Sequence, residues 1–228
     1  MAYSANVVEI MIASPDDVVK ERQVVQDVIY EWNCINSAER HIVLLPLRWE
    51  THSAPLMGIR PQEVINKQVL ERADILIGVF WTRIGTATGE SISGTVEEIE
   101  RHVKGGKRAM LYFSTTPLRP DNIDAKQYDE LKSFRSLCEK SGLVETYDGL
   151  SEFRNKLARQ LQITLNAVEK SEGQKAELFK KLESYGEDIA EIKRDLNSRT
   201  HIHVGPEAPK DPKVNDLWVD TNYSNVSS

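Results

Sequence analysis

One glutamate in this chain has the setting of a group that could take part in chemistry. Glu98 lies in the segment Ser93–Ile99, directly after a stretch rich in Gly, Ser and Thr over residues 83–93. The apolar run Ala73–Trp81 before that stretch predicts a buried parallel strand. Because ligands bind outside the carboxyl ends of such strands, we expect Glu98 at the ligand-binding edge. A carboxylate there can be a nucleophile or can stabilise a developing cation.

The same glutamate also has a purely structural interpretation. The sequence Thr95-Val96-Glu97-Glu98 fits a capping box, in which Thr95 caps the helix and Glu98 reaches back to it. The long polar loop before the helix favours a ligand site, in which Ser93 and Thr95 would contact the substrate beside Glu98. Glu97 is expected on another side of the helix, facing solvent.

The first predicted strand ends at another helix-start signal. Ser14-Pro15-Asp16-Asp17 predicts an N-cap serine, a proline at the first helical position and an acid at the third. Capping alone would explain this pattern. Alternatively, Ser14 and Asp17 lie where the free N–H groups of a helix N-terminus receive an anionic ligand.

Two further strand ends combine an aromatic ring with a cation. Arg48 and Trp49 end the second predicted strand, and Trp81 and Arg83 follow the third. Arginine can pair with phosphate or carboxylate, and tryptophan can stack on a base. Trp49 could equally fill the space beneath a long loop.

Several function classes lack their signatures. The loop at 83–93 has neither a Walker lysine nor a GxGxxG fingerprint, so phosphoryl transfer and conventional dinucleotide redox chemistry are not expected. The net charge of −6 gives no reason to expect nucleic acid or an anionic membrane as partner. His201 and His203 have ligand-like spacing without a supporting cluster, so no metal site is expected. Cys34 and Cys138 are expected to be buried, reduced thiols.

The first two thirds of the chain alternate short apolar runs with amphipathic segments. This alternation predicts an α/β fold of flavodoxin-like, three-layer type, with a parallel sheet of about five strands and helices on both faces. The predicted strands are Val7–Ala13, Ile42–Trp49, Asp74–Trp81, Arg108–Ser114 and Leu143–Tyr147. The predicted helices are Pro15–Asn36, Pro61–Arg72, Gly94–Lys104, Ala125–Lys140 and one from Leu150 onward.

The last third has a different character. We expect an α/β domain over residues 1–167, a helical segment over 168–197 and a flexible tail over 198–228. An apolar stripe in the helical segment has the 4-3 spacing of a coiled coil. It favours a homo-oligomer formed through residues 175–197, although the stripe could instead dock on the sheet domain. The tail segment 215–221 could form a small hairpin or a docking motif. The stripe residues are Leu178, Leu182, Tyr185, Ile189, Ile192 and Leu196.

The N-terminal region has no features of an export signal. Residues 1–6 lack the basic and apolar parts of a signal peptide, and the chain has no apolar run long enough to span a bilayer. We therefore expect a cytoplasmic protein without a membrane partner.

The strand Ala73–Val79 followed by Ser93–Ile99 resembles the TIR and nucleoside 2-deoxyribosyltransferase superfamily. The segment Ala13–Asp17 with Glu21 and Arg22 resembles the start of a TIR-like domain of the bacterial defence or signalling type. The resemblance covers about residues 5–165. A short cassette at 209–221 is similar to one in phage structural proteins, which points to the same setting.

The resemblance implies a hydrolase that cleaves the N-glycosidic bond of NAD or a related nucleotide. It implies that Glu98 acts at the ribosyl carbon, with Trp49 or Trp81 on a base and Arg48 or Arg83 on phosphate. NAD would be a substrate, and no cofactor is expected. The chain would act in antiviral defence after assembly, with a nucleotide signal or a partner protein involved. The alternative is a non-catalytic module that senses nucleotides or binds proteins and oligomerises through its C-terminal helix.

Overall fold

The computed structural model describes residues 2–54, 56–117, 124–198, 202–208, 210–211 and 216–220. Contacts divide the chain into two units, Met1–Ile163 and Thr164–Ser228, and the longest helix contributes to both. The elements of the first unit are β1 (Asn6–Ala13), η1 (Asp16–Val18), α1 (Val19–Arg40), β2 (Ile42–Leu47), α2 (Trp49–His52), α3 (Pro61–Ile65), η2 (Asn66–Leu70), β3 (Ile75–Phe80), α4 (Gly94–Lys104), β4 (Arg108–Ser114), α5 (Ala125–Ser141), β5 (Glu145–Tyr147) and the start of α6 (Leu150–Ser198).

The first unit is a parallel five-stranded sheet in the order β2-β1-β3-β4-β5. This is the flavodoxin-like order, so the predicted fold class is confirmed. The chain reverses its direction of travel across the sheet between β1 and β3. In a sheet of this topology the carboxyl ends of these two strands border the ligand crevice.

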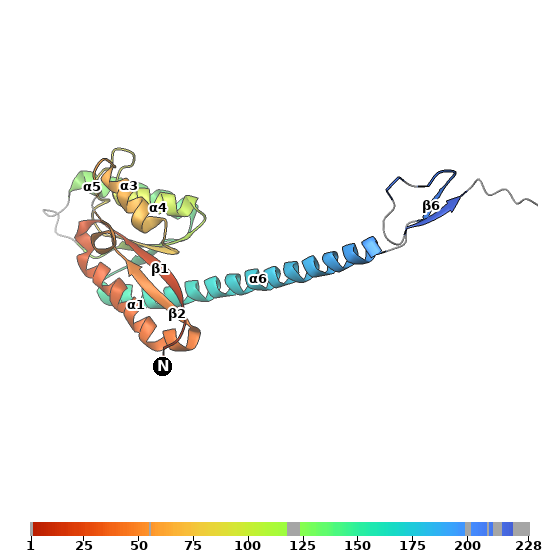
Figure 1. Ribbon diagram of the computed structural model, residues 1–228. Helices are drawn as coiled ribbons and strands as arrows, with labels where there is room; N and C mark the ends of the chain where they lie inside the picture. The colour runs from red at the N-terminus through yellow and green to blue at the C-terminus, as the bar shows by residue number, and fades with distance from the viewer. Residues whose placement is uncertain are drawn as a thin grey trace, which may run out of the picture. The chain divides into compact units, whose positions relative to one another are not determined.

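Helices cover both faces of the sheet (Figure 1). One face packs against η2, α4 and α5 through a core that includes Phe80, Ile99 and Phe134. On the other face, Tyr112 meets Phe153 of α6 edge-on, with ring centroids 5.2 Å apart. All six residues of β3 are buried, as its continuous apolar run predicts for a central parallel strand.

Several predicted boundaries are wrong for local reasons. The long helix α1 begins at Val19 rather than Pro15, because a short 3-10 turn, η1, precedes it. Strand β2 ends at Leu47, so Trp49 opens the short helix α2 instead of ending the strand. The helix predicted over 61–72 is regular only in α3 and continues as a π-helical turn, η2.

One thiol differs from expectation, and two short strands lie near the C-terminal end of the chain. Cys34 is exposed and Cys138 is half-buried, and both are free, so the prediction of two buried thiols is wrong for Cys34. Strands β6 (Ile202–Gly205) and β7 (Leu217–Asp220) pair in parallel, and β7 is the described part of the segment 215–221. Asn215 and Thr221, where the expected hairpin or docking motif begins and ends, lie outside the described residues. Within the described residues, every helix is too short or too polar to cross a membrane.

Candidate functional site

A pocket of about 320 Å³ lies at the carboxyl edge of the sheet. The segments after β1 and β3 border it, together with α2, α3 and the N-terminal ends of α4 and α5. It therefore lies at the strand-order reversal, where the fold predicts a ligand. Five of the residues expected to form a site line it, namely Ser14, Trp49, Arg83, Thr95 and Glu98.

Glu98 faces this pocket and does not cap its helix. The N-cap of α4 is Ser93, whose Oγ accepts a hydrogen bond from the Val96 N–H at 3.1 Å. The prediction of Thr95 as the cap is therefore wrong. With Ser93 as the cap, the third helical position belongs to Val96, so Glu98 does not hold the reach-back position of a capping box. The Glu98 side chain is nearly buried, at 5% exposure, and its Oε1 accepts a hydrogen bond from Gln62 Nε2 at 2.9 Å.

The burial of the N-terminal end of α4 explains why a carboxylate can be held there. Residues from Thr95 to Ile99 are all buried, and α4 contacts η2 and the strands β1, β3 and β4. Thr95 and Glu98 are three residues apart, so they share a face of the helix and both reach the pocket.

Three other side chains give the pocket its binding groups. Trp49 is 43% exposed, so its indole is a wall of the pocket and not a buried filler. Arg83 is exposed and brings a cation. Within the described part of the chain, the buried Ser14 Oγ makes no hydrogen bond, and the short helix after it has no side-chain cap. The hydrogen-bonding capacity of this hydroxyl is therefore unused at the border of the pocket.

The remaining predicted site residues lie outside the pocket. Asp17 accepts from Thr82 N and Thr82 Oγ1, both at 2.8 Å, and from Arg83 N at 3.2 Å. These bonds fix the start of the loop after β3, and Asp17 does not line the pocket. Trp81 donates its indole N–H to Thr116 O at 3.1 Å and borders a different hollow with Asp17. Ser93 is fully buried as the helix cap, and Arg48 is half-buried beside the start of α2.

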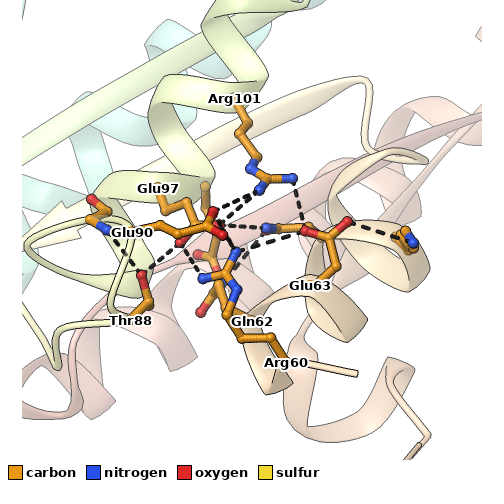
Figure 2. Close-up of polar contacts among 11 residues, drawn as sticks. Arg60, Gln62, Glu63, Thr88, Glu90, Glu97 and Arg101 are labelled. Carbon is orange, nitrogen blue, oxygen red and sulfur yellow. Dashed lines mark hydrogen bonds and ion pairs between the residues drawn. The ribbon is translucent and has the colours of Figure 1, made fainter. Parts of the chain in front are cut away.

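The expectation that Glu97 faces solvent is wrong. Glu97 is 5% exposed and accepts two hydrogen bonds from Arg60, at 3.0 and 2.7 Å. Asn66 and Thr88 donate to it at 2.9 and 2.7 Å, and Arg101 pairs with it at 3.1 Å. Figure 2 shows Arg60 and Arg101 approaching this carboxylate from different elements. Chiefly because of the hydrogen bonds from Arg60, the pKa of Glu97 is lowered to about 2.

This network connects the loop at 83–93 to the helices α3 and α4. Arg60 pairs with Glu90 at 3.0 Å as well as with Glu97, and Thr88 belongs to the same loop (Figure 2). On the other side of the pocket, Gln127 Oε1 accepts from Ile84 N and Gly85 N at 3.1 and 3.0 Å. The loop that carries Arg83 is therefore held at both ends by side chains.

Sequence reasoning missed Gln62 and Gln127 as parts of the site. Both lie near the start of helices at the carboxyl edge, and both line the pocket. Pro61 marks the start of its helix in the sequence, which was the available signal for Gln62. The described residues contain no cluster of three or more His, Cys, Asp or Glu side chains that could hold a metal ion.

Residues 9–162 match the family described as "Domain of unknown function (DUF4062)". The chain belongs to this family. The DUF4062 region takes in every predicted residue of the pocket and ends before the exposed part of α6. Among curated proteins, none matches this chain.

Two solved structures show a distant likeness to this DUF4062 protein. One is the apo form of translation elongation factor SelB from Methanococcus maripaludis, at 13% identity and a TM-score of 0.41, covering 72% of this chain. The chain spans only 37% of that protein's length. The other is a conserved protein from Enterococcus faecalis V583, at 10% identity and a TM-score of 0.35, covering 69% of this chain and 99% of that one.

Proposed function

We propose that the pocket cleaves the N-glycosidic bond of NAD or a related nucleotide, with Glu98 acting at the ribosyl carbon. The observation that carries this proposal is the placement of Glu98. Its carboxylate is nearly buried, lines the pocket at the strand-order reversal, and is not used as a helix cap. The resemblance to TIR-like and deoxyribosyltransferase-like domains supports the choice of substrate.

The proposed reaction breaks one bond and forms one. The C1′–N bond to the nicotinamide ring breaks, and its electron pair leaves with the ring, which becomes neutral. The ribosyl carbon gains oxocarbenium character. The Glu98 carboxylate either stabilises this carbon by its negative charge or bonds to it through one oxygen as a transient ester, which water then hydrolyses. Water then adds at C1′ and loses a proton, which gives ADP-ribose.

The other pocket residues bind the substrate in this proposal. Trp49 offers an aromatic face to a base, and Arg83 offers a cation to phosphate. Ser14 and Thr95 supply hydroxyl groups at the same edge. Arg48 and Trp81 lie outside the pocket, so Arg83 and Trp49 take these two roles.

Nicotinamide release from NAD tests the proposal. Wild type at high protein concentration should release nicotinamide, and Glu98→Gln, which keeps the side-chain shape, should lose activity at least about 100-fold. The matched control is Glu100→Gln, because Glu100 is exposed on the same helix and outside the pocket. Equal activity in wild type and Glu98→Gln, with both folded, would exclude a catalytic role for this glutamate.

A second candidate is a nucleotide-sensing or protein-interaction module that assembles through α6. Leu178, Leu182, Tyr185 and Ile189 are spaced by four, three and four residues and are 53 to 62% exposed. Such a stripe is unusual on a helix that has no partner. In this alternative the pocket binds a nucleotide without cleaving it, and self-association transmits the signal.

Sedimentation and calorimetry separate the two candidates. A folded wild type that binds NAD and self-associates without releasing nicotinamide would favour the sensing module. Leu182→Glu should abolish self-association in either case, because a charge at the centre of a heptad seam opposes pairing. If activity requires assembly, the same variant should also lose nicotinamide release. We place either function in the cytoplasm, in bacterial immunity or signalling.

A further inference from the structure

Glu98 has a neighbour that fixes where its carboxylate lies. Gln62 of α3 donates from Nε2 to Glu98 Oε1 at 2.9 Å, and both side chains line the pocket. The two residues belong to different helices and are 36 positions apart in the sequence. The hydrogen bond therefore ties the glutamate of α4 to a separate helix, α3.

The orientation of the Gln62 amide is determined by a second hydrogen bond. Gln62 Nε2 also donates to Asn66 Oδ1 at 3.4 Å, and Asn66 Nδ2 donates to Glu97 Oε1 at 2.9 Å. An ionised carboxylate only accepts, so Asn66 must present its NH₂ group to Glu97 and its oxygen to Gln62. Gln62 must then turn its own NH₂ group toward Asn66 and Glu98.

The chain also provides the space that this orientation needs. A Cβ added at Gly94 would lie 2.4 Å from Gln62 Oε1. Gly94 is the first residue of α4 and has no left-handed backbone, so its role here is to leave room and not to allow an unusual φ. An alanine would displace the flexible end of Gln62 while leaving the helix intact.

We propose that Gln62 is the positioning residue of Glu98, and that Glu97 and Asn66 fix the direction in which Gln62 donates. The proposal rests on the proposed function for its catalytic consequence, because Glu98 is the group that Gln62 positions. Adjacent glutamates then have separate roles: Glu98 faces the substrate, and Glu97 anchors the amide chain that holds it.

Side-chain amide signals in ¹⁵N–¹H spectra of the full chain test the hydrogen bonds without any activity. The Gln62 pair is identified by its loss in Gln62→Ala. It should shift in Glu98→Gln, which replaces the acceptor, in Gly94→Ala, which displaces the amide, and in Asn66→Leu, which removes the group that orients it. It should stay unchanged in Glu100→Gln. A Gln62 signal that is the same in wild type and in Glu98→Gln would overturn the proposal.

Kinetics test the catalytic consequence. Gln62→Ala and Gly94→Ala should each lower kcat for nicotinamide release about 10- to 100-fold, with KM for NAD changed less than about threefold. The double variant should be no slower than Gln62→Ala, because the alanine at 94 then has no amide left to displace. Losses that multiply, or a rise in KM with unchanged kcat, would overturn the positioning role.

Failure of the function and failure of the inference give different results. If wild type releases no nicotinamide, the proposed function fails, and the spectra alone decide whether Gln62 holds Glu98. If wild type is active but neither the spectra nor the kinetics respond to Gly94→Ala, the function stands and the positioning role falls.

Discussion

Arg60 donates a hydrogen bond from each terminal nitrogen to the Glu97 carboxylate, Nη1 to Oε2 at 3.0 Å and Nη2 to Oε1 at 2.7 Å. This fork matches the two oxygens of a carboxylate and is the strongest geometry available to an ion pair. It joins the residue before α3 to the first turn of α4, directly beside Glu98. The pocket is therefore supported by an ion pair that no ligand needs to touch.

Removing this support should destabilise the fold. Arg60→Met keeps the bulk of the side chain but leaves the nearly buried Glu97 with Arg101 as its remaining cation, and we expect unfolding to become easier by about 2 kcal/mol. Urea titration measures the change. Lys132→Met is the matched control, because its partner Asp129 is largely exposed, and it should leave the urea midpoint nearly unchanged. Equal losses in the two variants would contradict the role given to the Arg60 pair.

The same carboxylate should make the free energy of unfolding fall as the pH drops below about 4.5. Hydrogen bonds from Arg60 chiefly lower the pKa of Glu97 to about 2, from an ordinary value of 4.5. Between these values the unfolded chain binds the proton more readily, so stability rises with pH. The contribution of Glu97 is therefore complete above about pH 4.5 and is lost as the pH falls toward 2.

Urea midpoints measured from pH 5 down to pH 3 check this expectation. Wild type should lose stability steeply over this range, and Glu97→Gln should give a flatter curve. Glu100→Gln should follow wild type, because Glu100 is exposed. Parallel curves of midpoint against pH for wild type and Glu97→Gln would show that Glu97 is not responsible for the loss of stability in acid.

The contrast between Glu97 and Glu98 shows how far the sequence could predict this molecule. The strand and helix pattern was predictable, because buried runs such as Ile75–Phe80 and amphipathic helices carry their periodicity locally. The placement of Glu98 followed from the fold, since the residue after a central strand and loop must reach the carboxyl edge. Neither inference needed a partner from elsewhere in the chain.

The orientations of several side chains could not be predicted, because they depend on partners from distant segments of the chain. Nothing near Glu97 in the sequence indicates that Arg60 and Asn66 lie against it, so an acid in the first turn of a helix was assigned to solvent. Likewise, Asp17 and Trp81 stand at the expected strand ends, but hydrogen bonds to Thr82 and Thr116 turn them into loop supports. The position of a residue after a strand predicts that it lies at the carboxyl edge of the sheet. It does not predict the direction in which its side chain points.

The two cysteines should react at very different rates. Cys34 is exposed, whereas burial raises the pKa of the Cys138 thiol to about 11. The thiolate is the reactive form, so Cys138 should be almost inert in the folded chain at pH 7.5. A maleimide or disulfide reagent should label one thiol quickly, and Cys34→Ser should remove that fast phase. Rapid labelling of both thiols in folded protein would contradict this assignment.

His102 of α4 should destabilise the fold as the pH falls below neutrality. The side chain is 2% exposed, and burial, helped by Lys107, lowers its pKa to about 4 from an ordinary value of 6.5. Between these values the unfolded chain takes up a proton that the folded chain resists, so stability falls as the pH drops from about 6.5 to about 4. The loss should reach about 2 kcal/mol by pH 5 and about 3 kcal/mol at pH 4.

A non-titrating replacement isolates this effect. His102→Gln places an amide nitrogen near the position of Nε2, which lies 3.1 Å from Arg108 O, and it can keep a donor to that carbonyl. Its stability should be nearly constant between pH 6.5 and 5, where wild type declines. The range from pH 6.5 to 5 lies above the pH at which Glu97 begins to bind a proton. The effects of the two residues can therefore be told apart in one set of urea curves. If His102→Gln declines as steeply as wild type, another group must bind the proton.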